Sequence, residues 1–138
     1  MNLLLSFCLL FVSLIQADSN KILAENHTYK LYIFEGSDWC TNCLRLERQV
    51  LSTTTFEKTL GTHAVALEKV DFPQRKKLSK RLISRNDSLA TIYEFDGTFP
   101  TLVISRVDTL RFAKIQYSNQ SASELSEEII TKTKMLYD

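Results

Sequence analysis

Two cysteines in the run Cys40-Thr41-Asn42-Cys43 lie between a strand pattern and a helix pattern, and this junction constrains the fold more than any other feature. Residues 30–35 are rich in aromatic and aliphatic side chains, and Gly36 ends the run, which predicts a strand. A helical pattern opens over residues 38–43 and puts Cys43, Leu46 and Val50 on one face. The cysteine pair is therefore predicted at the start of a helix that directly follows a strand.

The rest of the chain predicts one α/β domain whose central mixed four-stranded sheet is flanked by helices. The three further strands are predicted at 64–71, 101–105 and 110–115. Further helical segments are predicted at 56–60, in the polar stretch after Pro73 up to a break at Asn86-Asp87, at 88–95, and after the capping box Ser121–Glu124. Strands and helices alternate in the first half, which implies a right-handed parallel crossover, whereas the last two strands form a hairpin.

Residues 1–17 are predicted to be a secretory signal peptide that is removed from the fold. The run from Leu3 to Ile15 is apolar and uncharged, and it is shorter than the about 20 residues that a spanning helix needs. Gln16-Ala17 resembles a cleavage region with a small residue at its end. No Lys or Arg precedes the run, and a buried core helix is the alternative. Cleavage would leave residues 18–138 as the domain and remove Cys8.

The charge of the chain gives no reason to expect nucleic acid or an anionic membrane as a partner, because its formal net charge is only +1. The chain has no repeat and no interdomain linker, which fits one domain. We also expect a monomer. Glycosylation sequons begin at Asn26, Asn86 and Asn119, and we attribute them to chance in a chain rich in Ser and Thr.

The spacing of the two mature cysteines favours redox chemistry over a purely structural disulfide. A bridge between residues three apart closes a very small loop and removes little entropy from the unfolded chain. At the N-terminus of a helix, unpaired N–H groups and the helix dipole stabilise a thiolate, so the pKa of the first thiol falls. Cys40 is the expected nucleophile, and Cys43, one turn further, is the expected resolving thiol.

Metal binding is the main alternative for such a pair. A structural zinc site needs two further Cys or His ligands, and the mature chain offers only His27 and His63, which lack paired spacing. Copper(I) binding to the two soft thiolates stays open. A further alternative is a peptide-binding module in which the cysteines are vestigial.

The chain resembles the thioredoxin family in two motifs that occur in the family's order. Trp39-Cys40-Thr41-Asn42-Cys43 matches its W-C-x-x-C, and Thr98-Phe99-Pro100-Thr101 matches its cis-proline before a strand. The resemblance covers essentially the whole mature chain and is nearest to secreted disulfide reductases of the Dsb type. It implies that Pro100 is cis and lies against the sulfurs, that the backbone of Phe99 pairs with a substrate peptide, and that Trp39 shields the cysteines. An ordinary trans proline and a core tryptophan are the alternatives.

The chain also departs from the family pattern. Many thioredoxins carry a buried acid six positions before the first cysteine, where this chain has Phe34. Glu35 should point to the other face of the strand from Phe34. The usual proton acceptor for Cys43 is therefore not expected in this chain. Glu47, four residues after Cys43, is the alternative acceptor, although we expect it on the solvated surface. Thr41-Asn42 replaces the usual Gly-Pro and should alter the redox potential.

The segment between Asp71 and Pro100 is longer than in minimal thioredoxins and is basic. A solvated helix face is the expected explanation, and docking to an acidic partner is the alternative. The basic residues are Arg75, Lys76, Lys77, Lys80, Arg81 and Arg85.

From this resemblance we expect an exported thiol–disulfide oxidoreductase, with reduction favoured over oxidation or isomerisation. It would act on disulfide-containing proteins and need no cofactor beyond its own Cys40–Cys43 dithiol. Electrons would come from a redox partner, membrane-bound if the protein is located in a bacterial periplasm.

Overall fold

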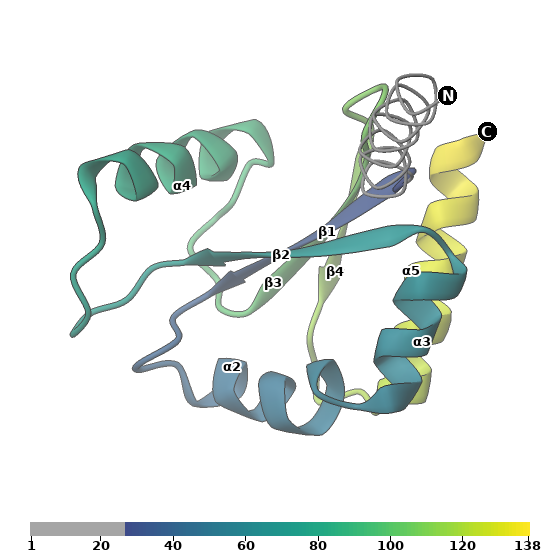
Figure 1. Ribbon diagram of the computed structural model, residues 1–138, viewed down its shortest axis with the longest axis horizontal. Helices are drawn as coiled ribbons and strands as arrows, with labels where there is room; N and C mark the ends of the chain where they lie inside the picture. Colours follow the sequence, from purple (N-terminus) through teal and green to yellow (C-terminus); the bar gives the residue numbers. More distant parts are fainter. Residues whose placement is uncertain (1–26) are drawn as a thin grey trace, which may run out of the picture.

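A four-stranded sheet with the order β2-β1-β3-β4 forms the centre of the computed structural model, which describes residues 27–138 (Figure 1). The strands are β1 (Tyr29–Glu35), β2 (Val65–Asp71), β3 (Thr101–Arg106) and β4 (Phe112–Gln116). β1 pairs in parallel with β2 and antiparallel with β3, and β3 pairs antiparallel with β4. This is the mixed sheet that the sequence predicted. The predicted signal peptide lies outside the described residues.

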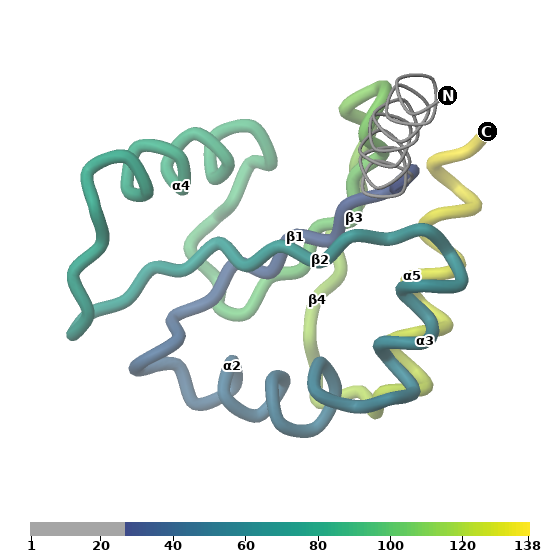
Figure 2. The backbone as a smooth tube through the Cα atoms, in the orientation of Figure 1, coloured from purple at the N-terminus to yellow at the C-terminus, as the bar shows by residue number. Residues whose placement is uncertain are grey.

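Helices cover both faces of the sheet, as predicted (Figures 1 and 2). One face carries α2 (Thr41–Leu46) with its π-helical continuation η1 (Glu47–Leu51), α3 (Thr54–Thr62) and α5 (Ala122–Tyr137), and the other carries α4 (Lys80–Ile92). The chain leaves β1 toward α2 and β2 toward α4 at the same end of the sheet (Figure 2). Within residues 27–138, no helix is both long and apolar enough to cross a membrane.

The alternation of side chains along β1 divides the interior into two cores. Leu31 and Ile33 are fully buried on the face of α2, α3 and α5, where they pack with Leu46, Phe56 and residues of α5. Tyr32 and Phe34 lie on the opposite face in a smaller core under α4. Successive residues of a strand point to opposite faces, so both faces of this central strand are buried.

The helix ends follow local capping chemistry. The predicted capping box at α5 is present: the Ser121 N–H donates to Glu124 Oε2 at 2.8 Å, and the Glu124 N–H donates to Ser121 Oγ at 3.3 Å. Thr53 caps α3 in the same way by accepting from the Phe56 N–H at 3.3 Å. These side chains satisfy N–H groups that the first turn of a helix leaves without partners.

The predicted helix break at Asn86-Asp87 is wrong, because α4 runs through both residues without interruption. Asn86 is buried, and its Nδ2 donates to the backbone oxygen of Asp71 at 2.8 Å. An asparagine disfavours helices when its side chain competes for nearby backbone groups, but here it bonds to the end of β2 instead. The same contact buries the amide of the sequon at Asn86.

Candidate active site at the Cys40–Cys43 disulfide

Cys40 and Cys43 form a disulfide at the N-terminus of α2, with their Cα atoms 5.2 Å apart. Cys40 is the N-cap residue, in an extended conformation, and its Sγ accepts the Cys43 N–H at 3.2 Å. Cys43 lies in the first turn and is the less exposed of the two, at 2% against 6% for Cys40. The sulfur of Cys40 therefore takes the place that a capping oxygen takes in other helices, next to N–H groups that favour negative charge.

A tight turn at Gly36 brings the disulfide to this position. The N–H groups of Trp39 and Cys40 both donate to the carbonyl of Gly36, at 3.2 and 2.9 Å. A Cβ atom on residue 36 would overlap the indole ring of Trp39. Only glycine lets the indole lie this close to the backbone at the end of β1.

Aromatic side chains gather next to the disulfide. The Trp39 ring meets the Phe99 ring edge-on at 5.2 Å between centroids, and Phe99 also contacts Phe72 at 5.8 Å and Phe95 at 5.0 Å. The Trp39 indole N–H donates to the backbone oxygen of Phe72 at 2.9 Å, which fixes the ring orientation. Trp39 and Phe99 are partly exposed, so the structure brings these two predicted residues together in one accessible apolar surface.

Pro100 follows this surface, is buried, and is preceded by a cis peptide bond, as the sequence predicted. Its role against the sulfurs stays a prediction.

Thr41 and Asn42 are both exposed in the first turn of α2. Arg45 donates to Asn42 Oδ1 at 3.2 Å and to Asn119 Oδ1 at 2.9 Å, which connects α2 to the segment before α5.

A buried carboxyl group lies at the end of β1, five residues before Cys40. Glu35 is 5% exposed and lies on the opposite face from Phe34, as strand alternation predicted. Helix α2 covers that face. Glu35 therefore supplies a carboxyl group on the α2 side, although position 34 carries no acid. Burial raises the pKa of Glu35, and the nearby Lys69 ammonium acts in the opposite direction.

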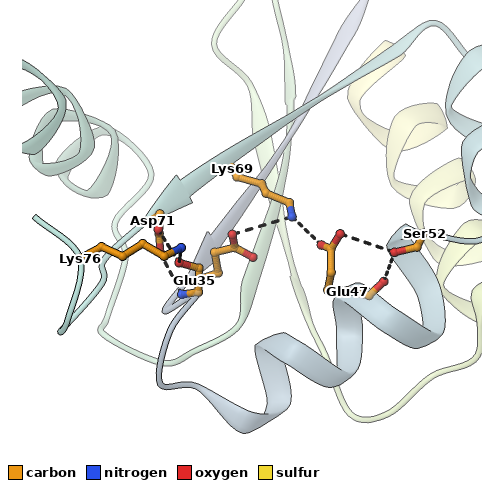
Figure 3. A network of polar contacts seen from close by, with 7 residues as sticks. Glu35, Glu47, Ser52, Lys69, Asp71 and Lys76 are labelled. Carbon is orange, nitrogen blue, oxygen red and sulfur yellow. Dashed lines mark hydrogen bonds and ion pairs between the residues drawn. The ribbon is translucent and has the colours of Figure 1, made fainter. Parts of the chain in front are cut away.

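Lys69 connects Glu35 to Glu47 (Figure 3). Its Nζ lies 3.9 Å from Glu35 Oε1 and 2.5 Å from Glu47 Oε2. Glu47 is partly solvated, as expected, and its backbone oxygen accepts from Ser52 Oγ at 2.7 Å. The sequence did not predict the role of Lys69. The usable signal was its position opposite Ile33 on the paired strand, because Ile33 and Glu35 lie on the same face of β1.

Asp38 anchors the loop after β2 to the loop that carries the disulfide. Its carboxylate accepts backbone N–H groups from Gln74, Arg75 and Lys76 at 2.9, 2.8 and 2.8 Å. Partial desolvation opposes ionisation, but these backbone N–H groups and the charge of Lys76 keep the pKa of Asp38 below its usual range. The sequence did not predict this contact. Its signal was the polar run 74–77, whose backbone donors need acceptors.

A second connection joins the same two loops. The Asp71 carboxylate accepts the N–H and the hydroxyl of Ser37, at 2.9 and 2.6 Å, and Lys76 Nζ donates to Ser37 Oγ at 2.9 Å (Figure 3). The carboxyl ends of β1 and β2 are thereby held together just before the chain reaches Cys40. In the part of the chain that the structure describes, no cluster of three or more His, Cys, Asp or Glu side chains could hold a metal ion.

Comparison with known proteins identifies a similar curated protein and several similar solved structures. No protein-family model matches the chain. The disulfide bond reductase DsbH of Chlamydia pneumoniae is 30% identical over 93 residues, which are 67% of this chain and 55% of that protein. The chain thus matches little more than half the length of this curated relative.

The similar solved structures include one titled DsbH oxidoreductase, with a TM-score of 0.72 and 25% identity over 80% of this chain and 76% of that chain. The C-terminal domain of Neisseria meningitidis DsbD, in its reduced form, has a TM-score of 0.56 and 15% identity over 88% of this chain and 96% of that chain, which supports the fold alone. The predicted resemblance is confirmed: the fold is thioredoxin-like, and the chain is similar in sequence and structure to the Dsb-type protein DsbH.

Proposed function

We propose that the protein is an exported thiol–disulfide oxidoreductase that reduces disulfides in other proteins through Cys40 and Cys43. The observation that carries this proposal is the position of Cys40 Sγ as the N-cap of α2, bonded to Cys43 in the first turn. The similarity to a disulfide bond reductase supports the direction, and the apolar run near the N-terminus supports export.

The reaction begins with the dithiol form of the protein. The Cys40 thiolate attacks one sulfur of a substrate disulfide, and the other substrate sulfur leaves as a thiolate that takes up a proton. Cys43 then loses its proton and attacks Cys40 Sγ, which releases the second substrate sulfur as a thiolate that also takes up a proton. The substrate gains two electrons and two protons, and the protein is left as the Cys40–Cys43 disulfide. A redox partner, membrane-bound in our proposal, reduces this disulfide again, and no cofactor beyond the dithiol takes part.

Cys43 needs a proton acceptor in the second step, and Glu35 is our candidate. Its carboxyl group is buried, lies on the sheet face that α2 covers, and has a pKa raised by burial. A carboxylate of higher pKa is a better base toward a thiol. Lys69 would hold Glu35 ionised before the transfer and connect it to the partly solvated Glu47.

In this proposal, the surface beside the disulfide binds the substrate. Trp39 and Phe99 would receive apolar side chains of the substrate, and the backbone before Pro100 would pair with an extended peptide. Thr41 and Asn42, exposed between the two cysteines, would tune the redox potential.

Insulin reduction tests the proposal directly. With dithiothreitol as the electron source, the wild-type protein should accelerate insulin precipitation, and Cys40→Ser should abolish this turnover. Cys43→Ser should instead accumulate mixed disulfides, visible on a non-reducing gel, because no second thiol resolves them. Undiminished turnover by Cys40→Ser would exclude Cys40 as the nucleophile.

The direction of electron flow requires a separate measurement. Equilibration with glutathione buffers gives the redox potential of the pair, and a reductase needs a potential below that of its substrates. A potential well above the surrounding thiol pool, with rapid oxidation of reduced substrates, would reverse the assigned direction. Copper(I) binding by a protein that fails to reduce insulin would favour a metal-binding module.

A further inference from the structure

A cavity of about 360 Å³ lies between the loop after β2 and α4, outside the disulfide site. Its apolar lining comes from Phe72, Pro73, Leu78 and Ile83, and its charged lining includes Lys76 and Lys77. Ile83 is 47% exposed and Leu82, its neighbour on α4, is 42% exposed. A concave apolar site with a few charged groups is typical of a binding site for a bulky apolar side chain.

The segment that forms this cavity is strongly basic. Residues 72–86 contain six Lys or Arg and no Asp or Glu, whereas the whole chain has a net charge of only +1. Arg85 pairs with Glu68, and Lys76 is bonded to Ser37. The other four are exposed and form no ion pair with a carboxylate of residues 27–138: Arg75, Lys77, Lys80 and Arg81.

The acidic residues at the cavity offset this charge only in part, because two carboxylates line it whereas residues 72–86 contain six Lys or Arg. One of the two is Asp71, whose carboxylate accepts hydrogen bonds from Ser37. Asp87 also lines it, next to an adjoining hollow that Lys80 and Ile83 share. An apolar cavity with unpaired cations around it is complementary to an apolar side chain flanked by carboxylates.

The cavity is connected to the redox site through its own wall. The Phe72 carbonyl accepts the indole N–H of Trp39, and the Phe72 ring contacts Phe99. Asp38, two residues before Cys40, holds the backbone of residues 74–76. A protein whose disulfide lies on the Trp39–Phe99 surface would therefore have a neighbouring segment next to the cavity.

We propose that this basic cavity binds an acidic segment, with a bulky apolar residue at its centre, of the protein that exchanges disulfides with Cys40. The identity of that protein as an exchange partner rests on the proposed function. Binding of the segment does not, because it involves no thiol.

The test uses a fluorescent, cysteine-free peptide with one phenylalanine flanked on both sides by glutamates. Two matched peptides carry glutamines in place of the glutamates, or alanine in place of the phenylalanine. Fluorescence anisotropy at low ionic strength should show the acidic phenylalanine peptide binding roughly tenfold or more tightly than either control, with affinity falling as salt is added. Equal binding of the three peptides would overturn the proposal.

Variants locate the binding. Lys77→Glu combined with Lys80→Glu, and separately Ile83→Ser, should each weaken the acidic peptide roughly tenfold. Lys58→Glu combined with Lys134→Glu, at exposed lysines of α3 and α5 on the opposite side of the sheet, is the matched charge control and should change nothing. Unchanged binding by both cavity variants would overturn the proposal. Displacement of the peptide by a single-stranded oligonucleotide at equal concentration would also overturn it, because it would indicate unspecific binding of polyanions.

Insulin reduction by the wild-type protein, measured in parallel, separates the two proposals. Insulin reduction without peptide binding refutes the cavity alone and leaves the proposed function standing. Peptide binding without insulin reduction refutes the function and leaves the cavity as a peptide site.

Discussion

Glu35 is a carboxyl group that the fold removes from water, and this has a consequence for stability. Burial raises its pKa in the folded protein above the ordinary value of 4.5. The folded state therefore binds the proton more tightly than the unfolded state does. Its stabilising contribution is present below pH 4.5 and is lost as the pH rises through the raised folded pKa.

Glu35→Gln should remove this pH dependence, because glutamine does not titrate. Relative to Glu35→Gln, the wild-type free energy of unfolding should fall as the pH is raised from 4.5 through neutrality. Urea denaturation of both proteins over this range, in the oxidised form, measures the difference. A difference that stays constant with pH would mean that the pKa of Glu35 is not raised.

Gly36 is the residue on which the position of Trp39 depends. Gly36→Ala would place a methyl group where the indole lies, and the resulting overpacking should lower the stability by about 1–3 kcal/mol. Trp39 is the single tryptophan of the chain, so its fluorescence reports displacement of the ring directly.

Gly61 provides the matched control. It lies near the end of α3, where an added Cβ meets no atom within 4 Å. Gly61→Ala should stabilise the protein by about 0.4–1 kcal/mol, through loss of freedom in the unfolded chain. Equal effects of the two substitutions would contradict the overlap at Gly36.

Among the elements, the loop between β2 and α4 is bonded at residues 74–76 to the Asp38 carboxylate. Asp38→Asn should weaken the bonds to the three N–H groups of residues 74–76 and speed their hydrogen exchange, while Glu127→Gln on α5 should not. Because the folded pKa of Asp38 is lowered, the anchoring is present above the ordinary pKa of 3.8 and is lost as the pH falls through the lowered value. Protection of these amides that is unchanged in Asp38→Asn would exclude the anchor.

Helix α4 is held to the sheet through Asn86. Asn86→Ala removes a hydrogen bond to the Asp71 carbonyl, which should cost about 1–2 kcal/mol in urea denaturation. Asp87→Ala, at the exposed neighbouring position, should have a much smaller effect. Similar losses in the two variants would show that the helix is not docked by this side chain.

For the molecule as a whole, the sequence predicted the strands, the mixed sheet and the cysteine pair at the start of α2, because these depend on patterns local to each element. It could not predict the role of Asn86, since the same side chain breaks or docks a helix according to what lies beneath it. The contacts of Asp38 and Lys69 were missed for a similar reason. Their partners are distant in sequence and meet only when β1 and β2 pair.

The two cores differ in size, and this predicts uneven stability across the molecule. The buried residues of α5 are Leu125, Ser126, Ile129, Thr133 and Leu136, whereas α4 buries only Asn86. Native-state hydrogen exchange should therefore show α4 opening at a lower free energy than α5. Equal protection of the two helices would contradict this expectation.

The separation of the two cores also bears on how such a protein can diversify. The exposed residues at the basic cavity, such as Lys77, Lys80 and Ile83, belong to neither core. Mutations there can accumulate, or be introduced by design, without disturbing the scaffold of the thiol pair. These exposed positions could change which proteins bind beside the disulfide while the thiol chemistry stays the same.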